Sequence, residues 1–300
     1  MPPGESIAPE SERPLALAAL FAGAVAIGAS PRFVKVSEAG PVSTAFWRVF
    51  LALPFLWAWT LAVDRSGGAP AQAKDERRLM AIAGAYFAGD LAVWHWSIVL
   101  TTVATATLLA NLAPIFVTLA VWLVFGQRPA LRFLAGLAMA VAGIALLLGG
   151  DVRVSGEVLL GDALGVLTAM FYAGYQLTVT RLRATTGTAR IMAWSGMVSA
   201  ALLLPVALLS GEQLFPSTGM GWLKLVGLAL VAQVAGQSLI AYAMAHLPPR
   251  LSSVGLLLQP VVAALFAWVL LGETLGEVQL VGALMVLIGI RIAHQAEAKR

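Results

Sequence analysis

The sequence contains no cysteine and few charged residues. The absence of cysteine from its 300 residues excludes a disulfide framework, a thiolate metal cluster and thiol chemistry. Charged residues make up 11% of the chain and apolar residues 60%, whereas a soluble domain carries about 25% charged residues. The mean hydropathy is +0.87. These proportions exclude an ordinary soluble domain, a disordered chain and a nucleic-acid-binding protein. The net charge of +4 comes from basic residues in the loops between apolar runs.

Apolar runs long enough to cross a bilayer occur repeatedly along the chain. A spanning helix needs about 20 mostly apolar residues. Such runs, separated by charged residues or by proline and glycine, predict an all-α integral membrane protein with ten transmembrane helices. The predicted spans are residues 15–36, 42–63, 78–99, 103–125, 131–149, 158–180, 191–210, 221–245, 251–271 and 277–294.

The distribution of Lys and Arg predicts the orientation of these spans. If the N-terminus is cytoplasmic, fourteen Lys and Arg residues lie on the inner side and five on the outer side. Residues 1–14 carry three glutamates and one arginine, whereas a secretory signal peptide begins with a basic leader. We therefore expect an uncleaved first helix. We also expect a multi-pass protein of the bacterial inner (plasma) membrane, with cytoplasmic tails at residues 1–14 and 295–300.

An internal repeat relates residues 104–145 to residues 250–291 at a constant offset of 146. Shared apolar residues are common by chance in such a chain, whereas proline, tryptophan and several glycines at one offset are not. The repeat predicts two five-helix units, residues 15–149 and 158–294. The aligned pairs are Pro114 with Pro260, Trp122 with Trp268, Gly126 with Gly272, Gly136 with Gly282, and Gly143 with Gly289.

Because each unit has an odd number of spans, the two units lie inverted in the membrane relative to each other. Inverted repeats of this kind characterise secondary transporters, whose substrate site lies near the midplane between the repeats. The repeat therefore favours transport by alternating access through a central cavity. A duplication kept only for packing is the alternative.

Three stretches of the sequence resemble a known family. Residues 253–260 read SVGLLLQP and residues 268–274 read WVLLGET, followed by Gly282 and Gly289. Residues 44–52 read TAFWRVFLA. These motifs resemble the drug/metabolite transporter (DMT) superfamily, EamA type, and most of all the YddG-type amino acid exporters. One departure is Gly126-Gln127-Arg128, where the family usually has Gly-Glu.

The resemblance implies a ten-helix basket in the inner membrane. Its central cavity would be lined by the first, third, fourth, sixth, eighth and ninth helices, with the fifth and tenth at the back. It also implies export of small metabolites, most of all amino acids (aromatic and other neutral), with a small-molecule substrate and the lipid bilayer as partners.

Polar residues inside the spans are the candidates for substrate binding, because a charged side chain at the bilayer centre costs about 2.5–3.5 kcal/mol. Asp90 is the one acid near the middle of a predicted span, and Tyr86, Asp90 and Trp94 share one helix face at a spacing of four. Asp90 would bind a substrate ammonium or a proton; alternatively, a neighbouring helix satisfies it. The full candidate set is Tyr86, Asp90, Trp94, His95, Asn111, Tyr172, Tyr175, Gln176, Gln233, Gln237, Tyr242 and Gln259.

Three prolines are predicted to break helices and to serve in gating: Pro31, Pro114 and Pro260. Asn111 and Gln259 lie close to two of them. Their amides could satisfy a backbone carbonyl that the proline frees, or they could bind the substrate.

Arg48 lies near the outer end of its span, where snorkelling to the headgroups is favoured over contact with a substrate carboxylate. The candidates include no cluster of Lys or Arg, which disfavours phosphorylated substrates and allows amino acids and organic cations.

Other classes of protein fit less well. The spans hold no clustered carboxylates and no evident Ser–His pairing, and the sequence has no phosphate-binding loop, so we expect no enzyme and no cofactor or metal site. A non-transporting membrane scaffold is a further alternative. No nucleic-acid partner is expected, and the sequence does not fix the oligomeric state.

Overall fold

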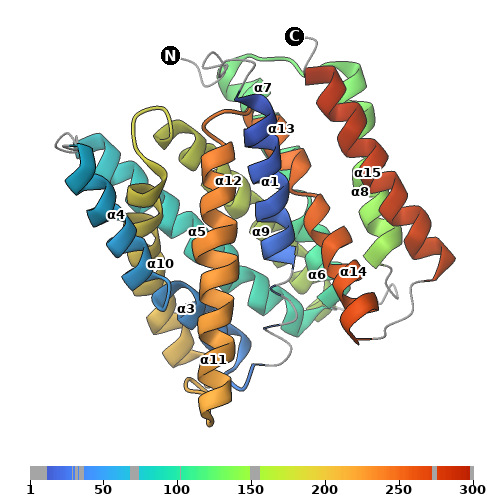
Figure 1. Ribbon diagram of the computed structural model, residues 1–300. Helices are drawn as coiled ribbons and strands as arrows, with labels where there is room; N and C mark the ends of the chain where they lie inside the picture. The colour runs from blue at the N-terminus through green and yellow to red at the C-terminus, as the bar shows by residue number, and fades with distance from the viewer. Residues whose placement is uncertain are drawn as a thin grey trace.

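A computed structural model describes residues 12–28, 30, 33, 37–67, 74–101, 103–148, 156–271 and 276–297. All regular elements within these ranges are helices, arranged side by side in a bundle (Figure 1). The helices are α1 (Arg13–Gly28), α3 (Pro41–Phe50), α4 (Leu53–Gly67), α5 (Lys74–Leu100), α6 (Val103–Ala110), α7 (Ala113–Phe125), α8 (Leu131–Leu148), α9 (Gly156–Leu182), α10 (Thr188–Leu209), α11 (Gly219–Leu228), the π-helix η1 (Ala229–Gln237), α12 (Ser238–Ala243), α13 (Pro249–Gly255), α14 (Leu258–Leu271) and α15 (Glu277–Glu297).

Eight helical segments of the described chain are long and apolar enough to cross a membrane. They are Pro41–Arg65, Thr105–Val124, Leu131–Leu148, Gly156–Leu182, Thr188–Leu209, Gly219–Ala243, Pro249–Phe266 and Glu277–Glu297. Two further helices lie outside this set. The apolar helix α1 has 16 residues, and α5 has 27 residues and carries Asp90. The predicted class, an all-helical membrane protein, is confirmed.

Two of the long helical segments are interrupted near a proline. The chain turns at residues 111–112 between α6 and α7, and at residues 256–257 between α13 and α14. Pro114 and Pro260 follow these turns, and a proline nitrogen cannot donate the helical hydrogen bond. At each turn the backbone therefore bonds three residues back instead of four, as in the 3.0 Å bond from Gln259 N to Leu256 O. Pro31, the third predicted break, lies outside the described residues.

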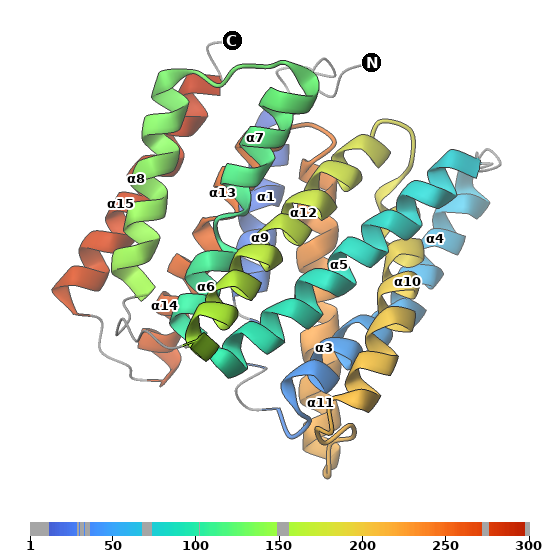
Figure 2. The same cartoon turned by 180° about the vertical axis from the view of Figure 1, so that it is seen from behind.

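Figures 1 and 2 show that α1 begins and α15 ends at the same end of the bundle. We name this the terminal end, and the opposite end the far end. Successive passes of the chain alternate in direction. As a result α1 runs from the terminal end to the far end, whereas α9, which opens the second half of the chain, runs from the far end to the terminal end.

Helices α8 and α15 lie side by side and antiparallel (Figure 2), and the positions of their glycines bring the two backbones into contact. A Cβ atom added to Gly136 would lie 2.7 Å from the carbonyl oxygen of Gly289. One added to Gly143 would lie 2.6 Å from the carbonyl oxygen of Gly282. Only glycine permits this approach. The contact is symmetric with respect to the repeat. Gly136 meets Gly289, the repeat equivalent of Gly143, and Gly143 meets Gly282, the repeat equivalent of Gly136.

Two glutamates tie the halves of the chain together at the far end. Glu38 accepts hydrogen bonds from the backbone nitrogens of Ser217 and Thr218, both at 2.9 Å, and from the Thr218 hydroxyl at 2.6 Å. The Thr218 hydroxyl is the main cause of the lowered pKa of Glu38. Glu212 in turn accepts a 2.9 Å bond from the nitrogen of Val42. Each carboxylate thus lies at the N-terminus of a helix in the other half, where the helix dipole favours negative charge.

The glycine contact predicts the effect of adding one methyl group. Replacing Gly143 with alanine is expected to lower the free energy of unfolding by about 1–3 kcal/mol, because the added Cβ collides with backbone rather than with a movable side chain. Unfolding of the purified protein by a denaturing detergent measures the change. Gly156→Ala is the matched control, since a Cβ there meets nothing within 4 Å. Equal stabilities of the two variants would contradict the backbone contact.

Candidate functional site

A cavity of about 200 Å³ lies inside the bundle. Its walls come from α1 and Ser30, and from α3, α5, α6 and the turn after it, α9, η1 and α14. The lining residues are Ile27, Gly28, Ser30, Arg48, Phe87, Asp90, Leu91, Trp94, Thr107, Ala110, Asn111, Thr168, Tyr172, Gln237, Gln259, Pro260 and Ala263.

Seven residues of the sequence-derived set line this cavity. They bring one acid, one indole, one phenol and three amides from five helical segments to a single space. These residues are Asp90, Trp94, Asn111, Tyr172, Gln237, Gln259 and Pro260. The helices that line the cavity are those that the resemblance implied, with α3 added, and the long helices α8 and α15 contribute none of its lining residues.

The other predicted residues lie elsewhere. Tyr175 stacks on Tyr172 with their ring centres 6.2 Å apart, and thus lies behind the wall. Tyr86 packs edge-on against Phe171, and Tyr242 packs against His246. Two further amides, Gln176 and Gln233, are buried in the bundle without lining the cavity, and Pro114 lies in the first turn of α7. The side chain of His95 lies outside the described part of the structure.

Arg48 lines the cavity, although its sequence position favoured a side chain directed to the headgroups. It belongs to α3, and its guanidinium lies 6.0 Å from the ring centre of Phe87, inside the bundle rather than at the headgroups. Its Nε is buried without a hydrogen-bond partner. Arg48 and Asp90 face the same cavity, close enough for each charge to act on the other. The position of Arg48 near a helix end gave snorkelling as the simpler interpretation, and only the tertiary packing directs the side chain inward.

Several polar atoms at the cavity lack a partner within the protein. The Asn111 amide nitrogen donates to the carbonyl of Thr107 at 2.8 Å, a carbonyl that also accepts from the Asn111 backbone nitrogen, and Asn111 lines the cavity. The Gln237 Oε1 and Gln259 Nε2 atoms, in contrast, are buried without hydrogen bonds. Buried polar groups of native proteins are usually paired. One atom of each of these two amides can therefore bind a ligand.

The cavity lies in the middle and far half of the bundle. Helix α1 contributes Ile27 and Gly28 from its far end, and α9 contributes Thr168 and Tyr172 from its middle. At the terminal end, every residue of α13 is buried. The bundle is therefore closed at the terminal end of the cavity.

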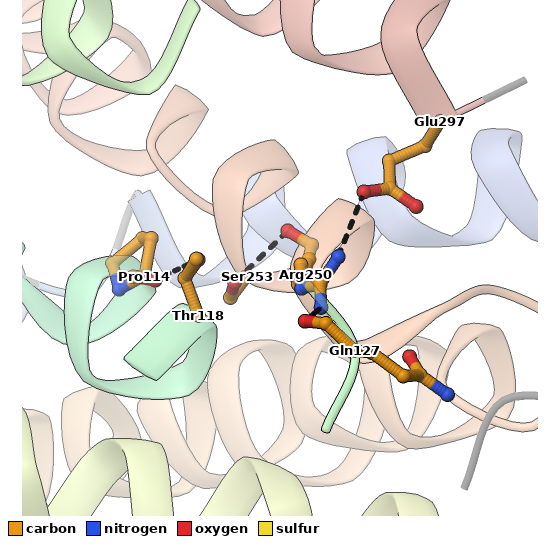
Figure 3. A network of polar contacts seen from close by, with 6 residues as sticks. All are labelled: Pro114, Thr118, Gln127, Arg250, Ser253 and Glu297. Carbon is orange, nitrogen blue, oxygen red and sulfur yellow. Dashed lines mark hydrogen bonds and ion pairs between the residues drawn. The ribbon is translucent and has the colours of Figure 1, made fainter. Parts of the chain in front are cut away.

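A polar network holds the closed terminal end together (Figure 3). Arg250, at the start of α13, is 3% exposed and forms an ion pair with Glu297 at the end of α15, with 3.4 Å between the charged atoms. Its guanidinium also donates to the carbonyl of Gln127, in the loop after α7. The Ser253 hydroxyl donates to the Arg250 carbonyl at 3.0 Å. One arginine thus connects a loop of the first half to two helices of the second half.

The fold is that of a multi-helix membrane protein with a cavity between its helices, and charged and amide side chains line part of that cavity. The sequence matches the EamA-like transporter family twice, over residues 14–149 and 159–293. The chain therefore belongs to the EamA-like transporter family, within the drug/metabolite transporter superfamily that the motifs resembled.

The relatives found by comparison are also transporters. An "Uncharacterized transporter" of Archaeoglobus fulgidus is 28% identical over 92% of this chain and 95% of its own length. A "Probable terminal-alkyne amino-acid exporter" of Streptantibioticus cattleyicolor is 28% identical over 67% of each chain. A solved crystal structure has the same fold, with a TM-score of 0.78, 19% sequence identity, and coverage of 97% of this chain and 100% of that one.

The Arg250 network predicts a large loss of stability when the arginine is removed. Arg250→Ala is expected to lower the free energy of unfolding by about 3–5 kcal/mol, because Glu297 would stay buried without its partner. Detergent-induced unfolding measures this loss. Arg132→Ala serves as the control, since Arg132 bonds to Gln295 between α8 and α15 on the exposed surface, and it should change the value by less than about 0.5 kcal/mol. Similar losses in both variants would rule out a special role for the buried ion pair.

Proposed function

We propose that the protein exports amino acids, aromatic and other neutral ones, from the cytoplasm across the bacterial inner membrane by alternating access. The observation that carries this proposal is the presence of Asp90 and Arg48 in one small, membrane-embedded cavity. An amino acid is a zwitterion, with one ammonium and one carboxylate on the same carbon. A cavity with one acid and one base matches both charges.

The two charges also separate this substrate class from the alternatives. An organic cation needs only the acid and would be repelled by Arg48. A phosphorylated metabolite needs several cations, and among the described residues the cavity lining includes one arginine and no lysine. Unpaired charges inside the membrane are costly. A ligand that pairs with both Asp90 and Arg48 therefore binds with a more favourable free energy than a ligand that pairs with only one of them.

Neutral groups of the wall fit the same substrate. Pro114 leaves the carbonyl of Ala110 without its helical donor, which makes that carbonyl an acceptor for the ammonium. The N-terminus of α14 and the unpaired Nε2 of Gln259 are donors suited to the carboxylate. Phe87, Trp94 and Tyr172 offer aromatic surface to the side chain. The volume of about 200 Å³ is smaller than the about 300–1,000 Å³ of pockets for drug-sized ligands.

We further propose that the chain crosses the membrane ten times, as two inverted five-helix repeats over residues 15–149 and 158–294, with both termini cytoplasmic. The two separate family matches, the opposite directions of α1 and α9, and the reciprocal glycine contact of α8 and α15 support this arrangement. In such a protein, exchanging the conformations of the two repeats converts one open state into the other. The printed name of the Streptantibioticus cattleyicolor relative supports the substrate class.

Counterflow into proteoliposomes tests the proposed substrate. Purified protein is reconstituted with an unlabelled amino acid inside, and uptake of labelled amino acids with aromatic, aliphatic, hydroxylated, acidic and basic side chains is measured against empty vesicles. We expect uptake of aromatic and other neutral amino acids, competed by the unlabelled compound. No counterflow of any amino acid by folded protein would refute the proposed substrate class, and counterflow of organic cations would replace it.

Matched variants assign the two charges. Asp90→Asn is expected to lower amino acid counterflow about tenfold or more, because a charge-assisted contact contributes about 1.5–3 kcal/mol. Arg48→Gln should lower amino acid counterflow by a similar factor. Counterflow of amines that lack the carboxylate should increase in this variant. Asp162→Asn is the control, since Asp162 lies on the spanning helix α9 but does not line the cavity. Equal counterflow in all three variants would contradict the assigned roles.

A further inference from the structure

The polar face of α9 continues beyond the cavity towards the terminal end. Tyr172 lines the cavity, and Gln176, Thr180 and Arg183 follow at intervals of four, four and three residues. At about 100° per residue, these four positions fall within roughly 80° of one another around the helix axis. The last three occupy the half of the bundle that is closed in this structure.

Gln176 is buried in this half without any hydrogen bond. Its side chain is 1% exposed, and neither its amide nitrogen nor its amide oxygen has a partner. A buried amide loses the hydrogen bonds that it makes in water, so an unpaired one destabilises the state in which it occurs. A leucine of similar size would fill the same space without this cost.

Thr180, one turn further along, shows the same behaviour. A threonine in a membrane helix can donate its hydroxyl to the carbonyl four residues earlier. Thr168 and Thr178 on the same helix do so, at 3.0 and 2.7 Å. The Thr180 hydroxyl is buried and makes no such bond. Thr180 thus differs from these two other threonines of α9, whose hydroxyls are bonded to the helix backbone.

The face ends at a cluster of polar side chains at the terminal end. Arg183 donates from Nη1 to the carbonyl of Thr186 at 2.7 Å, while its Nε is buried without a partner. Burial lowers the pKa of Arg183, and the nearby Tyr242 phenol acts in the opposite direction. The ring centre of His246 lies 4.6 Å from that of Tyr242, and its Nε2 lies 3.4 Å from a carboxylate oxygen of Glu12. The ends of α9 and α12 and the start of α1 therefore meet here.

We propose that the α9 face formed by Gln176, Thr180 and Arg183 is the closed half of the translocation pathway, and that the Arg183–Tyr242–His246–Glu12 cluster is its gate. The inference rests on the proposed alternating access. In the opposite state the helices around this face separate at the terminal end, and water and the passing substrate pair with Gln176 and Thr180. The unpaired groups destabilise the closed state and so reduce the free-energy difference between it and the opposite state.

Cysteine accessibility tests the pathway directly, because these 300 residues contain no cysteine that would react in the background. Thr180→Cys is compared with Thr178→Cys, which lies two residues away on the opposite side of α9 and whose hydroxyl is bonded to Gly174. The purified proteins are treated with a charged methanethiosulfonate reagent, and modification is followed by mass spectrometry. We expect Thr180→Cys to react about tenfold faster or more, because opening exposes it to water. Equal rates would overturn the inference.

A second variant distinguishes a pathway role from a structural one. Gln176→Leu is expected to raise Tm by about 2–4 °C, because it removes an unpaired buried amide, and to slow counterflow about tenfold, because the closed state becomes more stable. A lower Tm with unchanged counterflow would overturn the inference by making Gln176 a structural residue.

The labelling result does not depend on knowing the substrate. Fast modification of Thr180→Cys without any amino acid counterflow would leave the pathway standing and refute only the substrate class. Amino acid counterflow together with equal labelling of the two cysteine variants would refute only the pathway.

Discussion

The placement of two opposite charges inside a membrane-embedded bundle constrains the rest of the structure. Asp90 on α5 and Arg48 on α3 cannot face lipid without a large cost, so the helices around them must enclose a polar space. Breaks in two long helical segments supply that space with free backbone groups, and three amides add neutral donors and acceptors. The large apolar helices α8 and α15 stand away from the cavity and pack against each other through glycines.

The two ends of the bundle are held together in different ways. At the far end, Glu38 and Glu212 each lie at the start of a helix from the other half of the chain. At the terminal end, Arg250 joins the loop after α7 to α13 and α15. The proposed alternating access exchanges one closed end for the other, so under this proposal contacts of this kind break and form during the cycle. When these polar contacts break, water can form hydrogen bonds with the separated groups. Water cannot compensate in this way for the loss of tightly packed apolar contacts, so polar contacts suit such exchange better.

Much of this arrangement could be predicted from the sequence. The lengths of the apolar runs predicted a helical membrane protein, and the two family matches confirm the family resemblance. Acids are rare inside membrane spans, and this rarity singled out Asp90, which lines the cavity. Local patterns could not place Arg48, because its direction depends on how α3 packs against α5. They also missed the Arg250 network, since its partners Gln127 and Glu297 lie 123 and 47 residues away. Gln176 was predicted to bind substrate, but it does not line the cavity, and its burial without partners could not be predicted from the sequence.

The most direct test of the account is a comparison of three ligands binding to the purified protein by calorimetry. Phenylalanine carries both charges, phenethylamine only the ammonium, and 3-phenylpropionate only the carboxylate. If Asp90 and Arg48 bind the two ends of one zwitterion, phenylalanine should bind about tenfold tighter or more than either of the others, since each charged contact contributes about 1.5–3 kcal/mol. Binding of phenethylamine as tight as that of phenylalanine would contradict the account, because Arg48 would then contribute nothing to recognition of the substrate.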